Sequence, residues 1–250
     1  MPVNRLALLT VAMLVPFACA RAEEARAPKG VVELFTSQGC NSCPPADAVL
    51  ERLARRGDIL ALSYHVDYWN YLGWADTLAS KQNTGRQYGY AATMSRSNVY
   101  TPQAVLNGRV DVNGAHYDAV EDGLEKLGAQ GKGLVVAIQA SVTGKEMDIS
   151  VGPGSGSGDV VIAYFKRKQT VPITRGENAG KTITYLNSVT DVETVGMWKG
   201  QALQLKIPMS VMDVREYDGC AVLLQQTGPN GEPGPILGAA GLMSYAEKNE

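Results

Sequence analysis

Cysteine and histidine are scarce in this chain of 250 residues, which has four of the first and two of the second. Neither sign of charge dominates either, because 23 Lys and Arg residues stand against 25 Asp and Glu residues. A balance of this kind lacks the basic surface on which binding to nucleic acid or to anionic lipid depends. We therefore expect no nucleic-acid partner, and only a few positions carry candidate nucleophiles or metal ligands.

Low-complexity sequence is absent as well. The chain has 27 glycines and 12 prolines, which is below the roughly 25–30% of these residues that is typical of low-complexity chains. Hydrophobic residues make up 45% and charged residues 19% of the chain. This composition is typical of a globular protein, and the length allows one or two domains with a packed core.

Long hydrophobic runs are limited to one near the N-terminus. Residues 6–20 are mostly apolar, follow Arg5 and lead to the small residues Ala20 and Ala22, which is the pattern of a secretory signal peptide. The run is shorter than the roughly 20 apolar residues that a membrane helix needs, and Pro16 interrupts it. The sequence therefore predicts a signal peptide over residues 1–22, no stable membrane span, and a periplasmic or secreted protein.

Cleavage after residue 22 changes the charge and the cysteine count. It removes two arginines and no acidic residue, so the net charge falls from −2 to −4. It also removes Cys19, for which lipid attachment is an alternative, although Pro16 stands where a lipid-attachment motif has an aliphatic residue. Cys40, Cys43 and Cys220 remain, and a close pair of cysteines forms a disulfide in an oxidising compartment.

The periodicity of apolar residues changes near residue 130, from alternating strand-like and helical patterns to almost entirely strand-like ones. In the first half we expect parallel strands at 31–36 and 59–66, a helix between them from Pro44 to just before Gly57, helices within 75–94 and over 117–127, and a hairpin of 101–106 and 109–112 around Asn107-Gly108. In the second half we expect strands at 134–142, 147–151, 160–167, 181–189, 203–208, 221–226 and 236–243. Seven short strands favour a β-sandwich.

The motif Cys40-Asn41-Ser42-Cys43 is the strongest chemical signal, because it lies between a predicted buried strand and a predicted helix. Two intervening residues let the sulfurs reach disulfide distance, and the positive end of a helix stabilises a thiolate. We expect Cys40 to attack a substrate sulfur and Cys43, as the more buried cysteine, to resolve the mixed disulfide. The alternative is an inert structural disulfide.

Pro102 adds a second signal. It follows Thr101 and precedes a predicted strand and hairpin turn, the place where thioredoxin-like folds have a cis-proline that faces the dithiol. On this resemblance Thr101 and Pro102 align the backbone of an extended substrate, and Pro102 limits metal capture by the thiols. An ordinary proline at the start of a strand is the alternative.

Four segments together resemble a secreted bacterial family of thioredoxin-like proteins catalogued as a domain of unknown function. They are residues 31–47, 65–69, 100–105 and 175–181, so the resemblance covers essentially the whole mature chain. With the periodicity, it implies an α/β thioredoxin-like domain over residues 28–130, followed by an all-β, sandwich-like domain over residues 134–245. Asn41-Ser42 inside the motif departs from well-known thioredoxins, so the direction of electron flow does not carry over.

Glu33 and His65 are two further catalytic candidates. Glu33 resembles the buried acid that many thioredoxin-like proteins place beneath the dithiol, but it stands seven residues before Cys40, one more than usual; a carboxylate at a strand edge is the alternative. His65 ends the second predicted strand, where a cationic imidazole favours the Cys40 thiolate. Alternatively, His65 and Asp67 form a hydrogen-bonded pair that holds the following loop.

Aromatic residues follow His65 closely. They are Tyr68, Trp69, Tyr71 and Trp74. They form either an apolar rim for an unfolded substrate, with Trp69 as a substrate contact, or anchors for a long loop. The segment 175–182 looks at first like a phosphate-binding loop, but it has one residue too few between its glycines and leads into a predicted strand. Nucleotide binding is therefore not expected.

The sequence thus predicts an exported thiol–disulfide oxidoreductase that uses Cys40 and Cys43 on protein or small-molecule thiols and disulfides, without a cofactor. A redox partner protein is a further candidate partner. The alternative is a noncatalytic exported binding protein, or a Cu(I)- or Zn(II)-binding chaperone that uses the same cysteines, since soft thiolates suit Cu(I). We assign no metal site, because no cysteines and histidines have finger-like spacing. Cys220 is expected to be a small buried hydrophobe.

Overall fold

The computed structural model describes residues 27–208 and 217–243, so the predicted signal peptide and Cys19 lie outside the described residues. The strands in the described part are β1 (Gly30–Thr36), β2 (Ile59–His65), β3 (Gln103–Leu106), β4 (Val110–Asn113), β5 (Ile138–Thr143), β6 (Glu146–Val151), β7 (Gly158–Pro172), β8 (Thr182–Trp198), β9 (Leu203–Pro208), β10 (Gly219–Thr227) and β11 (Pro233–Met243). The helices are α1 (Pro44–Arg56), α2 (Lys81–Thr93) and α3 (Tyr117–Ala129), with a 3₁₀ turn at Asn70–Leu72.

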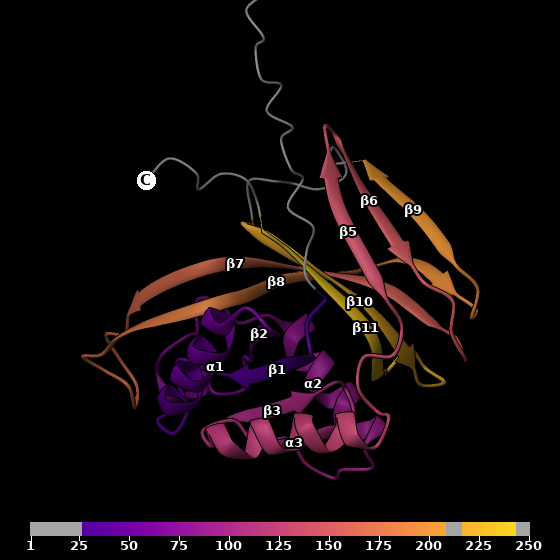
Figure 1. The fold of residues 1–250 in the computed structure, drawn as a ribbon. Helices are drawn as coiled ribbons and strands as arrows, with labels where there is room; N and C mark the ends of the chain where they lie inside the picture. The colour runs from indigo at the N-terminus through magenta and orange to yellow at the C-terminus, as the bar shows by residue number, and fades with distance from the viewer. Residues whose placement is uncertain (1–26, 209–216, 244–250) are drawn as a thin grey trace, which may run out of the picture.

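Strands from both halves of the chain form one mixed sheet. Its order is β11-β10-β7-β8-β2-β1-β3-β4, and β5, β6 and β9 form a second sheet. The predicted fold class, an α/β thioredoxin-like domain followed by a separate all-β, sandwich-like domain, is therefore wrong. The described residues are mostly β, their three α-helices have 13 residues each, and the large sheet crosses the predicted domain boundary (Figure 1). The division of the chain into segments 28–130 and 134–245 stays a prediction.

Two long strands join the two halves of the chain in one sheet. β7 and β8 have 15 and 17 residues and pair with each other along almost their whole length. β8 also meets β2, where Ser188 pairs with Ser63. Periodicity identifies a strand but not its partner, because pairing uses backbone groups that every residue type carries. The apolar pattern therefore does not identify the neighbour of β2 on this edge, and in the structure that neighbour is β8.

The predicted elements around the cysteine motif are confirmed. β1 and β2 are parallel, with Thr36 opposite His65, as the helix between them requires. α1 begins at Pro44, and Gly57 ends it with a φ of 73°, the left-handed conformation that favours glycine. The first strand, the motif and the helix therefore follow one another as the local sequence signals indicate.

The predicted hairpin is also present. β3 and β4 are antiparallel, and Asn107 and Gly108 join them with φ values of 48° and 62°. Positive φ at both positions is the turn that an Asn-Gly sequence favours. The Thr101–Pro102 peptide bond is cis, as predicted.

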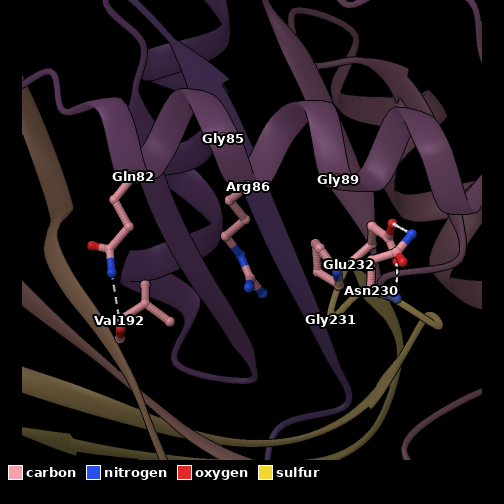
Figure 2. A pocket seen from close by; sticks show the side chains of 9 residues that line it. Gln82, Gly85, Arg86, Gly89, Val192, Asn230, Gly231 and Glu232 are labelled. Carbon is pink, nitrogen blue, oxygen red and sulfur yellow. Dashed lines mark hydrogen bonds between the residues drawn. The ribbon is translucent and has the colours of Figure 1, made fainter.

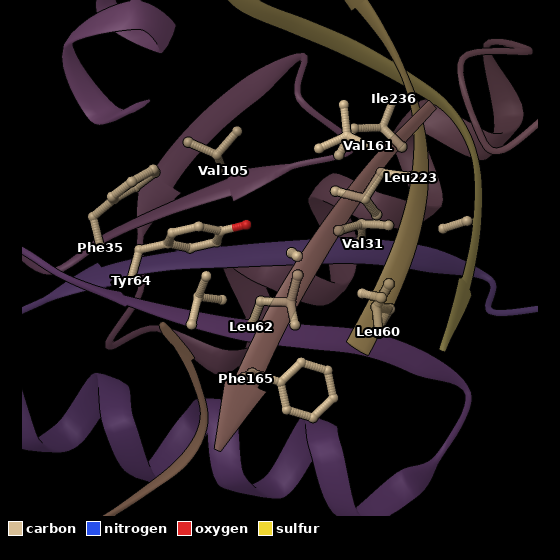
Figure 3. Packing of buried hydrophobic residues seen from close by; sticks show 14 of the residues in the cluster. Val31, Phe35, Leu60, Leu62, Tyr64, Val105, Val161, Phe165, Leu223 and Ile236 are labelled. Atoms are coloured by element: carbon tan, nitrogen blue, oxygen red, sulfur yellow. The ribbon is translucent and has the colours of Figure 1, made fainter. Parts of the chain in front are cut away.

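The two faces of β1 contact different layers, because successive side chains of a strand point to opposite sides. Val32 and Leu34 pack with residues of α1 and α3. Val31 and Phe35 face the other way and pack with residues of β7, β10 and β11 (Figure 3). We call these the α1 face and the α2 face, since α2 lies on the second one. Glu33 belongs to the α2 face.

The second half of the chain adds a further layer. Apolar residues of β7 and β10 pack against the three-stranded sheet of β5, β6 and β9. This second sheet lies at the end of the molecule away from α1 and α3 (Figure 1). No helix among the described residues has both the length and the apolar character needed to cross a membrane.

Candidate functional site

The predicted cysteine pair is a disulfide. The two Sγ atoms of Cys40 and Cys43 are 2.21 Å apart, and their Cα atoms are 5.4 Å apart. Both residues are buried, with exposed fractions of 1% for Cys40 and 0% for Cys43, so the expected difference in burial is almost absent. Only Asn41 and Ser42 of the motif are exposed.

Two local features act on the sulfur of Cys40. Ser42 Oγ lies 3.3 Å from Cys40 Sγ, and the hydroxyl is the donor because a disulfide sulfur carries no hydrogen. Cys43 is the N-cap of α1, so the positive end of the helix lies next to the pair. Pro44 and Pro45 lack amide hydrogens. The helix therefore acts on the sulfurs mainly through its dipole.

A loop from the second half of the chain covers the motif. We call residues 173–181, between β7 and β8, the clamp loop. Its Asn178 is fully buried. The side-chain Nδ2 of Asn178 donates to the backbone carbonyls of Gln38 and Cys40, at 2.9 and 2.8 Å. The clamp loop therefore holds the backbone on both sides of Gly39 and restricts access to Cys40.

Charged residues of the clamp loop fix its position. Lys181 Nζ donates to Asn178 Oδ1 at 2.8 Å. Glu177 accepts the N–H of Asn41 at 3.3 Å. The segment that resembles a phosphate-binding loop is thus the tip of a β-hairpin, and its polar groups bind the backbone of the cysteine motif.

Trp69 and Trp74 contact the motif from a second loop. Trp69 Nε1 donates to Thr101 Oγ1 at 2.8 Å, and a Cβ on Gly39 would lie 3.1 Å from Trp69 Cβ. Trp74 Nε1 donates to Gln38 Oε1 at 2.8 Å. The structure thus brings Trp69 and Thr101 together beside the residue that precedes Cys40. Because both indole N–H groups bind within the protein, both tryptophans also anchor their loop.

His65 pairs with Asp76, so the suggested pairing with Asp67 is wrong. His65 Nδ1 and Asp76 Oδ2 are 2.8 Å apart, and both side chains are fully buried. Asp67 instead accepts a hydrogen bond from Thr84 Oγ1 at 2.7 Å. Sequence distance favours the wrong partner here, because Asp76 lies in a loop that folds back onto the end of β2.

Asp76 links His65 to the motif. Asp76 Oδ2 accepts the N–H of Gln38 at 2.7 Å, two residues before Cys40. Burial opposes a charge on Asp76, but His65 and the N–H groups of Gln38 and Leu78 outweigh it and hold the pKa of this carboxyl below its usual range. Asp76 is therefore a fixed negative charge near neutral pH.

Asp47 lies on α1, one turn after Cys43, and is 6% exposed. In a helix, residues i and i+4 share a face, and the later side chain points back toward the earlier one. This spacing places Cys43 and Asp47 on the same face at the start of α1. Thr36 Oγ1 donates to its Oδ1 at 2.7 Å. Burial raises the pKa of Asp47 to about 7, since desolvation outweighs the attraction of His65 and the hydrogen bond from Thr36.

Tyr185 of β8 completes the group. Its ring meets the imidazole of His65 edge-on, with centroids 4.6 Å apart. Burial and the charges of Asp47 and Asp76 hold the pKa of its hydroxyl far above the usual range. We call Thr36, Asp47, His65, Asp76 and Tyr185 the dithiol-side cluster.

Three atoms of the dithiol-side cluster are buried and unpaired. Among the residues that the structure describes, none is a hydrogen-bond partner for Asp47 Oδ2, His65 Nε2 or Tyr185 Oη. Buried polar groups are nearly always hydrogen-bonded, and exceptions often have a chemical role. These three atoms are therefore candidates for a chemical role beside the disulfide.

Glu33 belongs to another cluster, on the α2 face. Its Oε1 accepts Arg86 Nε at 2.8 Å, and its Oε2 accepts the hydroxyl of Tyr90. Arg86 Nη2 donates to Gln225 Oε1 at 2.9 Å. We call Glu33, Arg86, Tyr90 and Gln225 the α2-side cluster. The structure does not bring Glu33 to the face that carries α1, so a catalytic role for Glu33 stays a prediction.

A pocket of about 350 Å³ lies beside the α2-side cluster. It is lined by Gln82, Gly85, Arg86, Gly89, Val192, Asn230, Gly231, Glu232 and Pro233. Arg86 extends from α2 into it, and Gln82 donates to the carbonyl of Val192 at 2.9 Å (Figure 2). None of the site residues predicted from the sequence is among these lining residues, so the pocket is separate from the dithiol.

Cys220 is buried in the core of the second half, with an exposed fraction of 4%. Burial raises the pKa of its thiol to about 12, so it stays protonated, and its predicted place as a small buried hydrophobe is confirmed. In residues 27–208 and 217–243, no group of three or more His, Cys, Asp or Glu side chains is arranged to hold a metal ion.

A model for a family of proteins of unknown function, DUF1223, matches residues 31–225. The match includes the cysteine motif, the clamp loop and both buried clusters. This chain belongs to the DUF1223 family. The predicted membership of a family of unknown function is thereby confirmed, and the family description names no activity.

Solved structures also resemble this DUF1223 protein. A protein from Agrobacterium tumefaciens, known from a structural-genomics crystal structure, is 50% identical over 90% of this chain and 98% of its own, with a TM-score of 0.82. HBP35 of Porphyromonas gingivalis is 12% identical over 90% of this chain and 79% of its own, with a TM-score of 0.62. The second likeness concerns the fold alone. No protein with a curated description matches the chain significantly.

The sequence does not reveal several residues of this DUF1223 site, among them Asp76, Tyr185, Asp47 and Asn178. Asp47 stands four residues after Cys43, a helical spacing that places both on one face, but only the structure shows that this face is buried. Asn178 lies in segment 175–181, which carries part of the family resemblance. Its contact with the motif joins residues 138 positions apart, and no local pattern indicates such a contact.

Proposed function

We propose that this protein is an exported thiol–disulfide oxidoreductase, located in the periplasm or secreted, that uses Cys40 and Cys43 on protein or small-molecule thiols. One observation carries the proposal: the disulfide closes at the start of α1, one helical turn from a buried carboxyl group that titrates near neutral pH. Thiol–disulfide exchange needs thiolates, and a titrating group beside the pair provides for them.

A purely structural disulfide fits this position less well. The two cysteines are three positions apart, so their bond closes a very short loop. In the chain-entropy model such a bond contributes about 2 kcal/mol, against about 3 kcal/mol for a 15-residue loop. Leu50 and Leu53 of α1 are already buried in the core, which holds the helix in place. Opening the bond therefore costs little stability, as a reversible pair requires.

The proposed reaction uses both sulfurs. A substrate thiolate attacks Cys40 Sγ, the bond between Cys40 and Cys43 breaks, and Cys43 leaves as a thiolate. A second substrate thiolate then attacks the substrate sulfur of the mixed disulfide, and Cys40 leaves as a thiolate. Two substrate thiols are oxidised to a disulfide, and the protein disulfide takes up the two electrons. The reverse sequence reduces a substrate disulfide.

Residues near Cys40 have distinct proposed parts. The hydroxyl of Ser42, 3.3 Å from Cys40 Sγ, stabilises the Cys40 thiolate together with the dipole of α1. His65 acts through Asp76, which holds the N–H of Gln38. Trp69, Thr101 and Pro102 are the proposed substrate contacts. Because Cys40 is 1% exposed, a substrate reaches it only after the clamp loop moves.

The test uses Cys43→Ser with glutathione disulfide. Its free Cys40 should form a stable mixed disulfide that carries one glutathione, visible by intact mass spectrometry, whereas Cys40→Ser should carry none. The wild-type pair should equilibrate between dithiol and disulfide across a series of glutathione redox buffers. A pair that stays oxidised in every buffer, together with no adduct on Cys43→Ser, overturns the proposal and leaves a structural disulfide.

A further inference from the structure

The buried position of Cys43 raises a problem for the exchange reaction. To resolve a mixed disulfide on Cys40, Cys43 must lose its proton, because the thiolate is the nucleophile. Cys43 is 0% exposed, and burial disfavours the charged form of a thiol. A resolving cysteine in this place therefore needs a proton acceptor within the protein.

Four buried ionisable side chains are candidates for this acceptor: Glu33, Asp47, His65 and Asp76. Glu33 lies on the α2 face, with both carboxyl oxygens bound to Arg86 and Tyr90. Asp76 binds His65 and the N–H groups of Gln38 and Leu78, and those contacts hold it in the charged form. His65 uses Nδ1 on Asp76.

Asp47 differs from the other three in place, and from Glu33 and Asp76 in bonding; His65 also has an unpaired ring nitrogen, Nε2, but it lies on β2. Asp47 is the one that lies on α1, four positions after the N-cap Cys43, a spacing that places both residues on one face of the helix. Thr36 binds Oδ1 at 2.7 Å, and Oδ2 has no hydrogen-bond partner among the described residues. One carboxyl oxygen is therefore held in place, and the other is free to bind a proton.

We propose that Asp47 takes the proton from Cys43 and returns it during the thiol–disulfide exchange; this inference rests on the function proposed above. In the resolving direction, the S–H proton of Cys43 passes to Asp47 Oδ2. The Cys43 sulfur then forms a bond with Cys40 Sγ, and the substrate sulfur leaves as a thiolate with the electron pair of the broken bond. In the other direction Cys43 leaves Cys40 as a thiolate and regains the proton from Asp47.

The surroundings of Asp47 set the pH at which this transfer works. Burial opposes the charged carboxylate most strongly, and the charge of Asp76 opposes it too, whereas His65 from β2 and the hydrogen bond from Thr36 favour it. Tyr185 from β8 remains protonated, because burial holds its pKa far above neutral. The balance leaves the pKa of Asp47 at about 7. A group with this pKa accepts and releases a proton with similar ease at neutral pH.

The experiment separates the two steps of the reaction. Reduced protein is mixed with glutathione disulfide at a series of pH values and quenched with acid, and mass spectrometry follows the mixed disulfide as it forms and decays. We expect Asp47→Asn to slow the decay about 100-fold at pH 7, the lower range of general acid–base effects. The formation step, which uses Cys40, should keep its rate. The rise of the wild-type decay rate with pH around 7 should be lost.

Glu51→Gln is the matched control. Glu51 lies on the same helix, one turn after Asp47, and its exposed carboxylate pairs with Arg55. Its replacement should leave both steps and the pH profile unchanged. If Glu51→Gln slows the decay of the mixed disulfide to a comparable extent, the proposed role of Asp47 is contradicted.

Thr36→Val provides a second test that keeps the carboxyl group. It removes the hydrogen bond that favours the charged form of Asp47, so the rise in the decay rate should move to higher pH. A merely structural role of Asp47 predicts no such movement. Thr36→Val therefore tests the inference even if Asp47→Asn does not fold. An unmoved profile overturns the inference.

The two proposals fail in different ways. If wild-type protein forms no mixed disulfide at any pH, the oxidoreductase function fails. If wild-type protein forms and resolves it, and Asp47→Asn resolves it at the same rate, the function stands and the inference about Asp47 is overturned.

Discussion

Two buried polar clusters lie on opposite faces of the same pair of strands, and they are built differently. In the α2-side cluster both carboxyl oxygens of Glu33 are bound, one of them by the guanidinium of Arg86. In the dithiol-side cluster one oxygen of Asp47 is bound by Thr36, and the other has no partner among the described residues. Complete pairing indicates a structural role, whereas incomplete pairing beside a disulfide indicates chemistry.

We expect the largest loss of stability where a buried charge loses its partner. Arg86→Met should lower the free energy of unfolding by about 3–5 kcal/mol, because it leaves the buried Glu33 without a counter-charge. Urea unfolding at neutral pH measures the loss. Arg55→Met is the control, since its pair with Glu51 is exposed and such pairs contribute about 0.5 kcal/mol or less. Equal losses in the two variants contradict the structural role of the α2-side cluster.

Asp47→Asn should have a stability effect that depends on pH. The folded protein binds a proton on Asp47 up to about pH 7, whereas the unfolded chain releases it near 3.8. Wild-type stability therefore falls as pH rises from about 4 to 7, by about 4 kcal/mol in total, and this cost stays constant above 7. The free energy of unfolding of Asp47→Asn should not fall in this way, because asparagine does not titrate.

Urea unfolding of the oxidised proteins at pH 4.5, 6 and 8 measures this difference. Relative to wild type, Asp47→Asn should become steadily more stable as the pH rises to 7. Glu51→Gln should show no such trend, because its carboxylate is exposed. Parallel curves for wild type and Asp47→Asn contradict a raised pKa for Asp47.

Asn178→Ala tests how the clamp loop covers the cysteine motif. It removes two hydrogen bonds to the carbonyls of Gln38 and Cys40, which should cost about 1–3 kcal/mol. If about 1.4 kcal/mol of this loss destabilises the closed position of the clamp loop relative to the open one, reduction of the disulfide by dithiothreitol should become about tenfold faster.

Asn187→Ala is the matched control for the clamp loop. Asn187 is also a nearly buried residue whose Nδ2 donates to a backbone carbonyl, that of Ala61, at 2.8 Å. It should lose similar stability and keep the wild-type reduction rate. Equal acceleration in both variants means that general loosening, and not the clamp loop, controls access to Cys40.

Local signals predicted the elements around the motif well. Pro44 and Gly57 mark the ends of α1, and Asn107-Gly108 marks the hairpin turn, because each signal depends on the backbone preferences of one or two residues. The partners of these elements were not predictable in the same way. β8 joins the edge of β2 at Ser63 and Ser188, so two expected domains share one sheet.

In the candidate site, too, local features were predictable and contacts between distant residues were not. The spacing of Cys40 and Cys43 predicted their disulfide, and the resemblance to thioredoxin-like folds predicted the cis bond at Thr101–Pro102. The acidic residues were assigned less well. Glu33 is a candidate because it resembles the buried acid of thioredoxin-like proteins, yet strand alternation turns it to the α2 face. Asp76, the true partner of His65, lies in a loop whose path no periodic pattern describes.

The sequence by itself determined the cysteine pair, the strand and helix on either side of it, and the hairpin turn, because each depends on residues a few positions apart. Only the tertiary structure decided which strands share a sheet, that Asn178 covers Cys40, and that Asp47 is buried with one unpaired carboxyl oxygen. Burial and pairing depend on groups far apart in the chain, such as Asn178 and Gln38, which are 140 positions apart. The helix places Asp47 one turn after Cys43, and burial by the rest of the fold raises the pKa of its carboxyl group to about 7.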